Sequence, residues 1–264
     1  MAISMTDLLA LMRRLRDPVT GCPWDREQTL ASLVKYTLEE AYEVADVVAR
    51  QALDELPDEL GDLLFQVVFY AQIAEELGQF DFHTVVEAIH RKLVRRHPHV
   101  FGAGELTTAS AQAAAWEALK AAERAGRLQA TTVSELDDVP LALPASARAL
   151  KLQQRAARVG FDWPAVMPIF DKLLEEVAEL RAAISEGLSL EAQTGELGDV
   201  IFAAINLGRH LGINPEDAVR STNAKFERRF RHIETQLHAQ GRRPAQADLH
   251  ELDTLWEQAK ALGL

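Results

Sequence analysis

The chain has 264 residues, of which 48% are hydrophobic and 26% are charged, with 14 Gly and 10 Pro. This composition excludes collagen-like, low-complexity and disordered chains, and the length predicts one large domain or two of about 130 residues. Because 40 acidic residues outnumber 28 basic ones and give a net charge of −12, we expect neither nucleic acid nor a membrane surface as a partner.

A single cysteine, Cys22, excludes an intramolecular disulfide, a cysteine-based zinc site and a CxxC redox pair. Charges interrupt the first 16 residues, so they do not resemble a secretory signal. The longest mostly apolar stretch, residues 63–74, is too short to span a bilayer. We therefore expect a cytoplasmic protein.

Apolar residues recur at helical spacing along nearly the whole chain, and no segment alternates convincingly with period two. A first helix containing Leu8 and Leu15 ends before Pro18, and another containing Leu60 and Ala71 follows Pro57. The remaining helices are expected at 28–50, 82–96, 110–124, 145–158, 165–186, 190–211, 215–240 and 248–262. This pattern predicts an all-α fold.

Four sequence blocks occur twice, in the same order, at offsets of 133 to 140 residues. The blocks are Glu39-Glu40-x-x-Glu43 with Glu175-Glu176-x-x-Glu179, Glu59-Leu-Gly-Asp62 with Glu196-Leu-Gly-Asp199, Lys92-x-x-Arg95-Arg96 with Lys225-x-x-Arg228-Arg229, and Trp116-Glu-x-x-Lys120 with Trp256-Glu-x-x-Lys260. Such repetition indicates tandem duplication. We expect an N-terminal domain at 1–125, a polar linker at 126–144 and a C-terminal domain at 145–264.

The repeated carboxylates have the spacing of a metal site. Glu176 and Glu179 share one helix face, and Glu196 and Asp199 share a face of the next helix. An antiparallel hairpin turning near Gly187 would bring the four together, where they repel one another unless a cation lies between them. Carboxylate oxygens without His or Cys favour Mg²⁺, with Mn²⁺ as the alternative.

Three other interpretations of these acids stay open at this point. A glutamate-rich helix can simply present a solvated face. A ferritin-like di-iron bundle also collects glutamates, but it requires two Glu-x-x-His pairs and the chain offers only Glu87 with His90. A non-catalytic helical interaction module would use the acids for solubility, and removing them would leave divalent cation binding unchanged.

The acidic signature resembles the all-α nucleoside triphosphate pyrophosphohydrolases, the superfamily of the MazG proteins, dimeric dUTPases and phosphoribosyl-ATP pyrophosphohydrolases. Further strings resemble two-domain bacterial MazG proteins over essentially the whole chain: GCPWD (21–25), RRHPHVF (95–101), VGFDW (159–163) and KFERRF (225–230). The resemblance implies four-helix-bundle-like assemblies built by homodimerisation.

The resemblance also implies hydrolysis of a nucleoside triphosphate to the monophosphate and pyrophosphate, in nucleotide-pool control or house-cleaning. Mg²⁺ held by Glu176, Glu179, Glu196 and Asp199 would activate a water that attacks the α-phosphorus. Glu175 and Glu176 are the expected catalytic residues. Glu175 either orients or deprotonates the water or has a solvated, supporting role.

Substrate contacts are carried over by position in the family motifs. Lys225, Arg228 and Arg229 are expected at the triphosphate, joined by Lys172, which lies one turn before Glu176. Trp256 is expected to stack on the base, although a lone Trp is often a core residue, while Lys260 reaches a phosphate. Asn206 is either a sugar or base contact or a satisfied buried amide.

The two halves differ in one informative position, because Asn206 corresponds to Phe69 in the N-terminal copy. The N-terminal half nevertheless retains Glu40, Glu43, Glu59 and Asp62 as a possible second site. In the resembling family the C-terminal domain is credited with catalysis. We therefore expect the N-terminal site to be mainly structural or regulatory.

Overall fold

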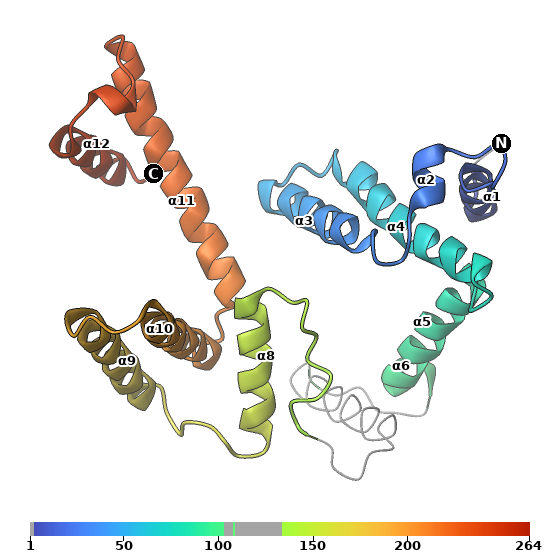
Figure 1. Ribbon diagram of the computed structural model, residues 1–264, viewed down its shortest axis with the longest axis horizontal. Helices are drawn as coiled ribbons and strands as arrows, with labels where there is room; N and C mark the ends of the chain where they lie inside the picture. Colours follow the sequence, from blue (N-terminus) through green and yellow to red (C-terminus); the bar gives the residue numbers. More distant parts are fainter. Residues whose placement is uncertain (1–2, 103–107, 109–133) are drawn as a thin grey trace. The chain divides into compact units, whose positions relative to one another are not determined.

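The computed structural model describes residues 3–102, 108 and 134–264 (Figure 1). All regular structure in these residues is helical, which confirms the predicted all-α fold. The chain divides into two compact units, Met1–Ala122 and Glu123–Leu264, called here the N-terminal and C-terminal units.

The N-terminal unit is built around a helical hairpin. Its helices are α1 (Met5–Leu15), α2 (Pro23–Glu27), α3 (Val34–Arg50), α4 (Leu56–Glu76), α5 (Phe82–Arg96) and α6 (Pro98–Phe101). Helices α3 and α4 pack together, and α1 packs on α4 (Figure 1). The buried core beneath α1 consists of Met12, Leu33, Val68, Phe69 and Ile73.

The C-terminal unit repeats the hairpin and extends it. Its helices are α8 (Ala145–Arg158), α9 (Met167–Ser185), α10 (Leu190–His210), α11 (Pro215–Ala239), the 3-10 helix η1 (Pro244–Gln246) and α12 (Leu249–Ala261). Helices α9 and α10 form the hairpin, and α8 packs on α10 (Figure 1). Helix α12 folds back on α11 over a small core of Ile233, Leu237 and Leu255.

Local sequence explains where the hairpin helices stop and start. Gly187 has a φ of +68°, a conformation that glycine adopts without steric strain. The Leu188 N–H donates to the Ala183 carbonyl at 2.9 Å and closes the end of α9. The Ser189 side chain then accepts a hydrogen bond from the Ala192 N–H and caps α10. The expected turn near Gly187 is therefore confirmed.

Some predicted boundaries are wrong. The helix expected from residue 28 begins only at Val34, because Thr29 and Ser32 exchange side-chain-to-backbone hydrogen bonds of 2.9 and 3.2 Å that form a turn. The short helices α2 and α6 were not expected. The helix expected at 110–124, with Trp116 and Lys120, lies outside the described residues, as does part of the expected linker.

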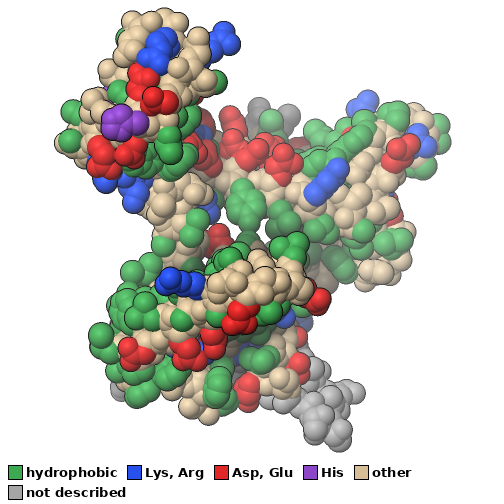
Figure 2. All heavy atoms as spheres, turned by 60° about the vertical axis from the view of Figure 1, so that its left-hand side comes forward, with side chains coloured by type: hydrophobic (Ala, Val, Ile, Leu, Met, Phe, Trp, Pro, Cys, Tyr) green, Lys and Arg blue, Asp and Glu red, His purple; other side chains and the backbone are tan. Residues whose placement is uncertain are grey.

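Both hairpins expose apolar side chains. On α9 and α10, Leu174 is 67% exposed, and Val177, Leu197 and Ile201 are each about half exposed. Figure 2 shows many hydrophobic side chains at the surface of one face. No helix among the described residues is both long and apolar enough to cross a membrane. The exposed hairpin faces are large enough to pack against another helical surface.

The core position of Phe69 generates a prediction about stability. Phe69 is fully buried, so Phe69→Ala should leave a cavity and lower the free energy of unfolding by about 3–5 kcal/mol. Guanidinium denaturation followed by circular dichroism measures this change. Val19→Ala is the control, because Val19 is 84% exposed and its truncation should change stability by no more than about 0.5 kcal/mol. Equal effects of the two substitutions would contradict the assigned core.

Candidate active site

Three carboxylates converge where α9 faces α10. One oxygen from each of Glu176, Glu196 and Asp199 lies within 4.8 Å of the other two. Helical spacing puts Glu196 and Asp199 on one face of α10, and the hairpin brings that face to Glu176 on α9. Glu176 is only 7% exposed, so its charge is largely removed from solvent. We call these three residues the C-terminal acid cluster.

The neighbouring residues of α9 respond to this charge. The Lys172 Nζ lies 2.7 Å from the Glu175 carboxylate and 2.8 Å from that of Glu176, and these contacts raise the pKa of Lys172. A hydrogen bond with Glu176, together with burial, raises the pKa of the exposed Glu179 carboxyl. Glu179 thus touches the acid cluster, while Lys172 already supplies one positive charge to its edge.

The donor set of the cluster suits a hard divalent cation. Its ligand atoms are carboxylate oxygens from two rigid helices, and it includes no His or Cys, the combination that favours Mg²⁺ or Mn²⁺ over zinc or copper. The position of the Lys172 ammonium beside Glu176 indicates that a positive charge is stabilised there. The residues present therefore fit a magnesium ion.

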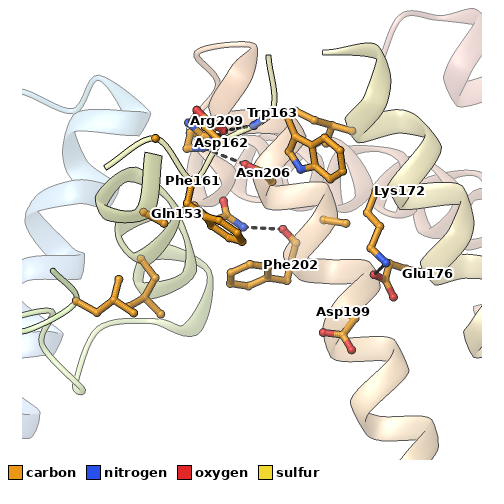
Figure 3. A pocket seen from close by; sticks show the side chains of 16 residues that line it. Gln153, Phe161, Asp162, Trp163, Lys172, Glu176, Asp199, Phe202, Asn206 and Arg209 are labelled. Atoms are coloured by element: carbon orange, nitrogen blue, oxygen red, sulfur yellow. Dashed lines mark hydrogen bonds and ion pairs between the residues drawn. The ribbon is translucent and has the colours of Figure 1, made fainter. Parts of the chain in front are cut away.

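A cavity of about 670 Å³ adjoins the acid cluster, and Glu176 and Asp199 line it. Its walls come from α8, α9, α10 and the loop that joins α8 to α9 (Figure 3). Three of the lining residues are aromatic: Phe161 and Trp163 on the loop and Phe202 on α10. A flat apolar group can therefore lie between aromatic walls next to the carboxylates.

Two amide side chains also line this cavity. Gln153 is only 7% exposed, and its Nε2 donates to the Phe202 carbonyl oxygen at 2.8 Å. Its buried Oε1 has no hydrogen-bond partner among the described residues. The Oδ1 of Asn206 accepts a hydrogen bond of 3.0 Å from the Nε of Arg209. Figure 3 shows both amides at the edge of the hollow.

Arg209 also binds the loop. Its Nη1 donates to Asp162 Oδ2 at 3.0 Å, its Nη2 donates to Asp162 Oδ1, and the His210 Nε2 lies 2.9 Å from that same oxygen. The hydrogen bonds from Arg209, reinforced by His210, lower the pKa of Asp162 to about 2. Asp162 therefore remains ionised at neutral pH and holds the loop to α10.

The other expected substrate contacts lie together elsewhere in the C-terminal unit. The Arg229 guanidinium lies 5.4 Å from the centre of the Trp256 ring, and its Nε donates to the Leu264 main-chain oxygen at 2.7 Å. Lys260 pairs with Glu257 at 2.8 Å, while Lys225 and Arg228 are exposed on α11. None of these five expected contact residues lines the described cavity.

The N-terminal hairpin carries a related cluster of Glu40, Glu43 and Glu59, with oxygens within 4.8 Å of one another. Burial, followed by repulsion from Asp62 and Glu43, raises the pKa of Glu40, and burial with Glu43 raises that of Glu59. The space beside this cluster differs from its C-terminal counterpart, because Phe69, at the position of Asn206, is buried in the core with Met12.

Several residues of the cavity had no role in the sequence interpretation. The VGFDW string indicated the family, but it did not indicate that Asp162 pairs with Arg209 or that Trp163 lines the cavity. Gln153 lies in a helix whose period was recognised, but a buried unpaired oxygen leaves no mark on periodicity. Only the packing of α8 on α10 shows these contacts.

Comparison with known proteins identifies the family. The model of the MazG nucleotide pyrophosphohydrolase domain matches twice, at residues 28–101 and 168–234. A nucleoside triphosphate pyrophosphohydrolase of Escherichia coli K12 is 50% identical over 257 residues, 96% of this chain and 95% of the relative. A nucleoside triphosphate pyrophosphohydrolase/pyrophosphatase MazG of Thermotoga maritima is 38% identical over 258 residues, 98% and 96% of the two chains.

An uncharacterized protein of Bacillus subtilis is 41% identical over 251 residues, which are 95% of this chain but 50% of that protein. The two family matches cover both helical hairpins, each with its acid cluster. The enzyme class expected from the motifs, nucleoside triphosphate pyrophosphohydrolase, is confirmed by these similarities. The chain belongs to the family of MazG nucleotide pyrophosphohydrolases.

Proposed function

We propose that the C-terminal unit hydrolyses nucleoside triphosphates between the α and β phosphates, with Mg²⁺ as the metal and Mn²⁺ as an alternative. The observation that carries this proposal is the convergence of Glu176, Glu196 and Asp199 beside an aromatic-lined cavity. Water adds to the α-phosphorus, the bond to the bridging oxygen breaks, and pyrophosphate leaves. The nucleoside monophosphate is the other product.

Glu176, Glu179, Glu196 and Asp199 would hold the ion. When bound, Mg²⁺ supplies charge neutralisation for the phosphate oxygens and a lowered pKa for the attacking water. Glu175 is exposed and is held by Lys172 one turn from Glu176, so it is placed to accept the proton of that water. Lys172 would exchange its contact with Glu176 for a phosphate oxygen once the metal balances the carboxylates.

The remaining cations belong to the proposed homodimer. Lys225, Arg228 and Arg229 do not line the cavity, although a triphosphate requires positive charge beyond the metal. The exposed apolar side chains of α9 and α10 offer a surface on which a second copy packs as a four-helix bundle. We propose that α11 and α12 of one protomer complete the site of its partner, with Lys260 and Trp256 contacting substrate.

The N-terminal cluster has a different role in this proposal. Glu40, Glu43, Glu59 and Asp62 can bind a cation, but Phe69 and Met12 fill the core beside them where the C-terminal unit has its cavity. The N-terminal unit is therefore structural or regulatory. Nucleotide-pool control in the cytoplasm fits the reaction.

A matched pair of double substitutions tests which unit is catalytic. Glu176→Gln with Glu179→Gln should abolish nearly all pyrophosphate release, because the ion loses two charged ligands. Glu40→Gln with Glu43→Gln should retain most of it. The measurement is pyrophosphate release from a panel of nucleoside triphosphates with and without Mg²⁺.

Circular dichroism of both double variants controls for loss of helix. Equal losses of activity would indicate two working sites per chain. A larger loss from the N-terminal substitutions would overturn the assignment of catalysis to the C-terminal unit, and unchanged activity of both variants in Mg²⁺ would overturn the metal site itself.

Complementation tests the shared site. A protomer with Glu176→Gln and Glu179→Gln is mixed with one carrying Lys225→Ala and Arg229→Ala, each inactive alone. Mixed dimers contain one site with intact carboxylates and intact cations, so activity should return. Light scattering should give about twice the 29.3 kDa of one chain.

Refolding the two variants together ensures that subunits exchange. Each variant refolded alone is the control and should stay inactive. A dimer of the expected mass that shows no recovery would mean that each protomer supplies its own cations, whereas a mass near 29.3 kDa would overturn the dimer itself.

A further inference from the structure

The cavity beside the C-terminal acid cluster combines two features that have separate causes. Aromatic side chains on the loop and on α10 give it flat apolar walls, and Gln153 and Asn206 add two polar groups. An amide can present either its oxygen or its NH₂ group to a ligand. What a ligand meets is therefore decided by which end of each amide is already occupied.

The partner of Gln153 fixes its orientation. A main-chain carbonyl oxygen can only accept a hydrogen bond, so the Gln153 atom that lies 2.8 Å from the Phe202 oxygen must be Nε2. The other end, Oε1, is a buried acceptor with no partner among the described residues. Leaving such a group unpaired costs about 1–3 kcal/mol, which a donor on a ligand would recover.

The orientation of Asn206 is fixed in the same way. The Nε of arginine can only donate, so the Asn206 atom 3.0 Å from it must be Oδ1. The NH₂ end of Asn206, a residue that lines the cavity, is thereby left to donate elsewhere. The cavity thus combines one acceptor, from Gln153, with one donor, from Asn206.

Arg209 links this amide to the aromatic wall. Its Nε holds Asn206, and its two terminal nitrogens hold the Asp162 carboxylate, between Phe161 and Trp163. The side-chain oxygen of Asp162 also accepts a hydrogen bond of 2.8 Å from the Trp163 N–H, which fixes that residue's main chain. One guanidinium therefore sets both the polarity of Asn206 and the position of the loop.

The N-terminal unit lacks each part of this arrangement. The residue at the position of Asn206 is Phe69, buried in the core, and the residue at the position of Arg209 is Gln72. Gln72 donates to Glu76 on its own helix at 3.1 Å. The chain therefore contains a copy of the hairpin in which an acid cluster persists without the oriented amides.

From these contacts we infer that the cavity reads the nucleobase of the substrate, through Gln153 as acceptor and Asn206 as donor, and that Arg209 is the positioning residue that fixes what Asn206 presents. The inference rests on the proposed function, because it concerns the substrate of that site. The ligand it predicts is a planar heterocycle with a hydrogen-bond donor close to an acceptor. Stacking on Trp256 is the competing location for the base, but Arg229 already lies over that ring.

The test compares nucleoside triphosphates with a base-free probe, 2-deoxyribose 5-triphosphate. Arg209→Lys keeps the charge but cannot hold Asn206 and Asp162 together, so KM for nucleotides should rise about tenfold, with kcat changed less than about twofold. Asn206→Ala and Gln153→Met should do the same. For each variant the loss should be confined to substrates that carry a base.

A double variant separates positioning from a general structural effect. If Arg209 acts through Asn206, Arg209→Lys combined with Asn206→Ala should be little worse than either alone. Gln154→Met is the matched control, because Gln154 is exposed on the same helix as Gln153 and should behave as wild type. Thermal unfolding of every variant reports whether the fold is intact.

Each outcome has a separate meaning. Equal loss on the base-free probe, or losses that multiply in the double variant, would overturn the role of Arg209. A base-free probe that the wild type binds as well as nucleotides, or a KM effect confined to Trp256→Ala, would overturn base recognition in the cavity while the proposed hydrolysis stands. Absence of pyrophosphate release from every substrate by the wild type would instead overturn the proposed function.

Discussion

Repulsion among carboxylates held between two helices is the constraint on which the rest of the molecule depends. In each hairpin, three acidic side chains approach within 4.8 Å, and in the N-terminal unit their effect is visible in the raised pKa of Glu40 and Glu59. Such a cluster persists only on a rigid scaffold, because flexible side chains would separate. The tight turn at Gly187 and the packing of α9 on α10 provide that scaffold, and a cation relieves the repulsion.

The two copies of the hairpin use the space beside their acids differently. In the N-terminal unit, Phe69 and Met12 are fully buried and close the contact between α1 and α4. In the C-terminal unit, α8 and α10 leave a cavity with Gln153 and Asn206 on its walls. Filling a space with Phe adds hydrophobic stability, whereas a hollow forfeits it. The duplicated chain thus separates a stable core from a ligand-binding hollow without changing the hairpin that supports both.

Periodicity and repeats predicted the helices, the tandem hairpins and the acidic residues, because each is encoded within about 20 residues of sequence. The cavity could not be predicted in the same way. Arg209 and Asp162 are separated by 47 residues, and Gln153 and Phe202 by 49, so their pairing depends on how α8 packs on α10. The turn formed by Thr29 and Ser32 was missed for another reason: side-chain hydrogen bonds there override an otherwise helical pattern.

Recognition by amides requires more than the amides themselves, and this explains the charge placed around Asn206. A free carboxamide can rotate by half a turn and exchange donor for acceptor, which would remove any preference between bases. Arg209 prevents this rotation, and Asp162, with a pKa of about 2, stays ionised and holds the guanidinium through two hydrogen bonds. Because Asp162 lies in the loop that carries Phe161 and Trp163, the stacking wall and the hydrogen-bonding edge of the cavity are fixed by the same ion pair.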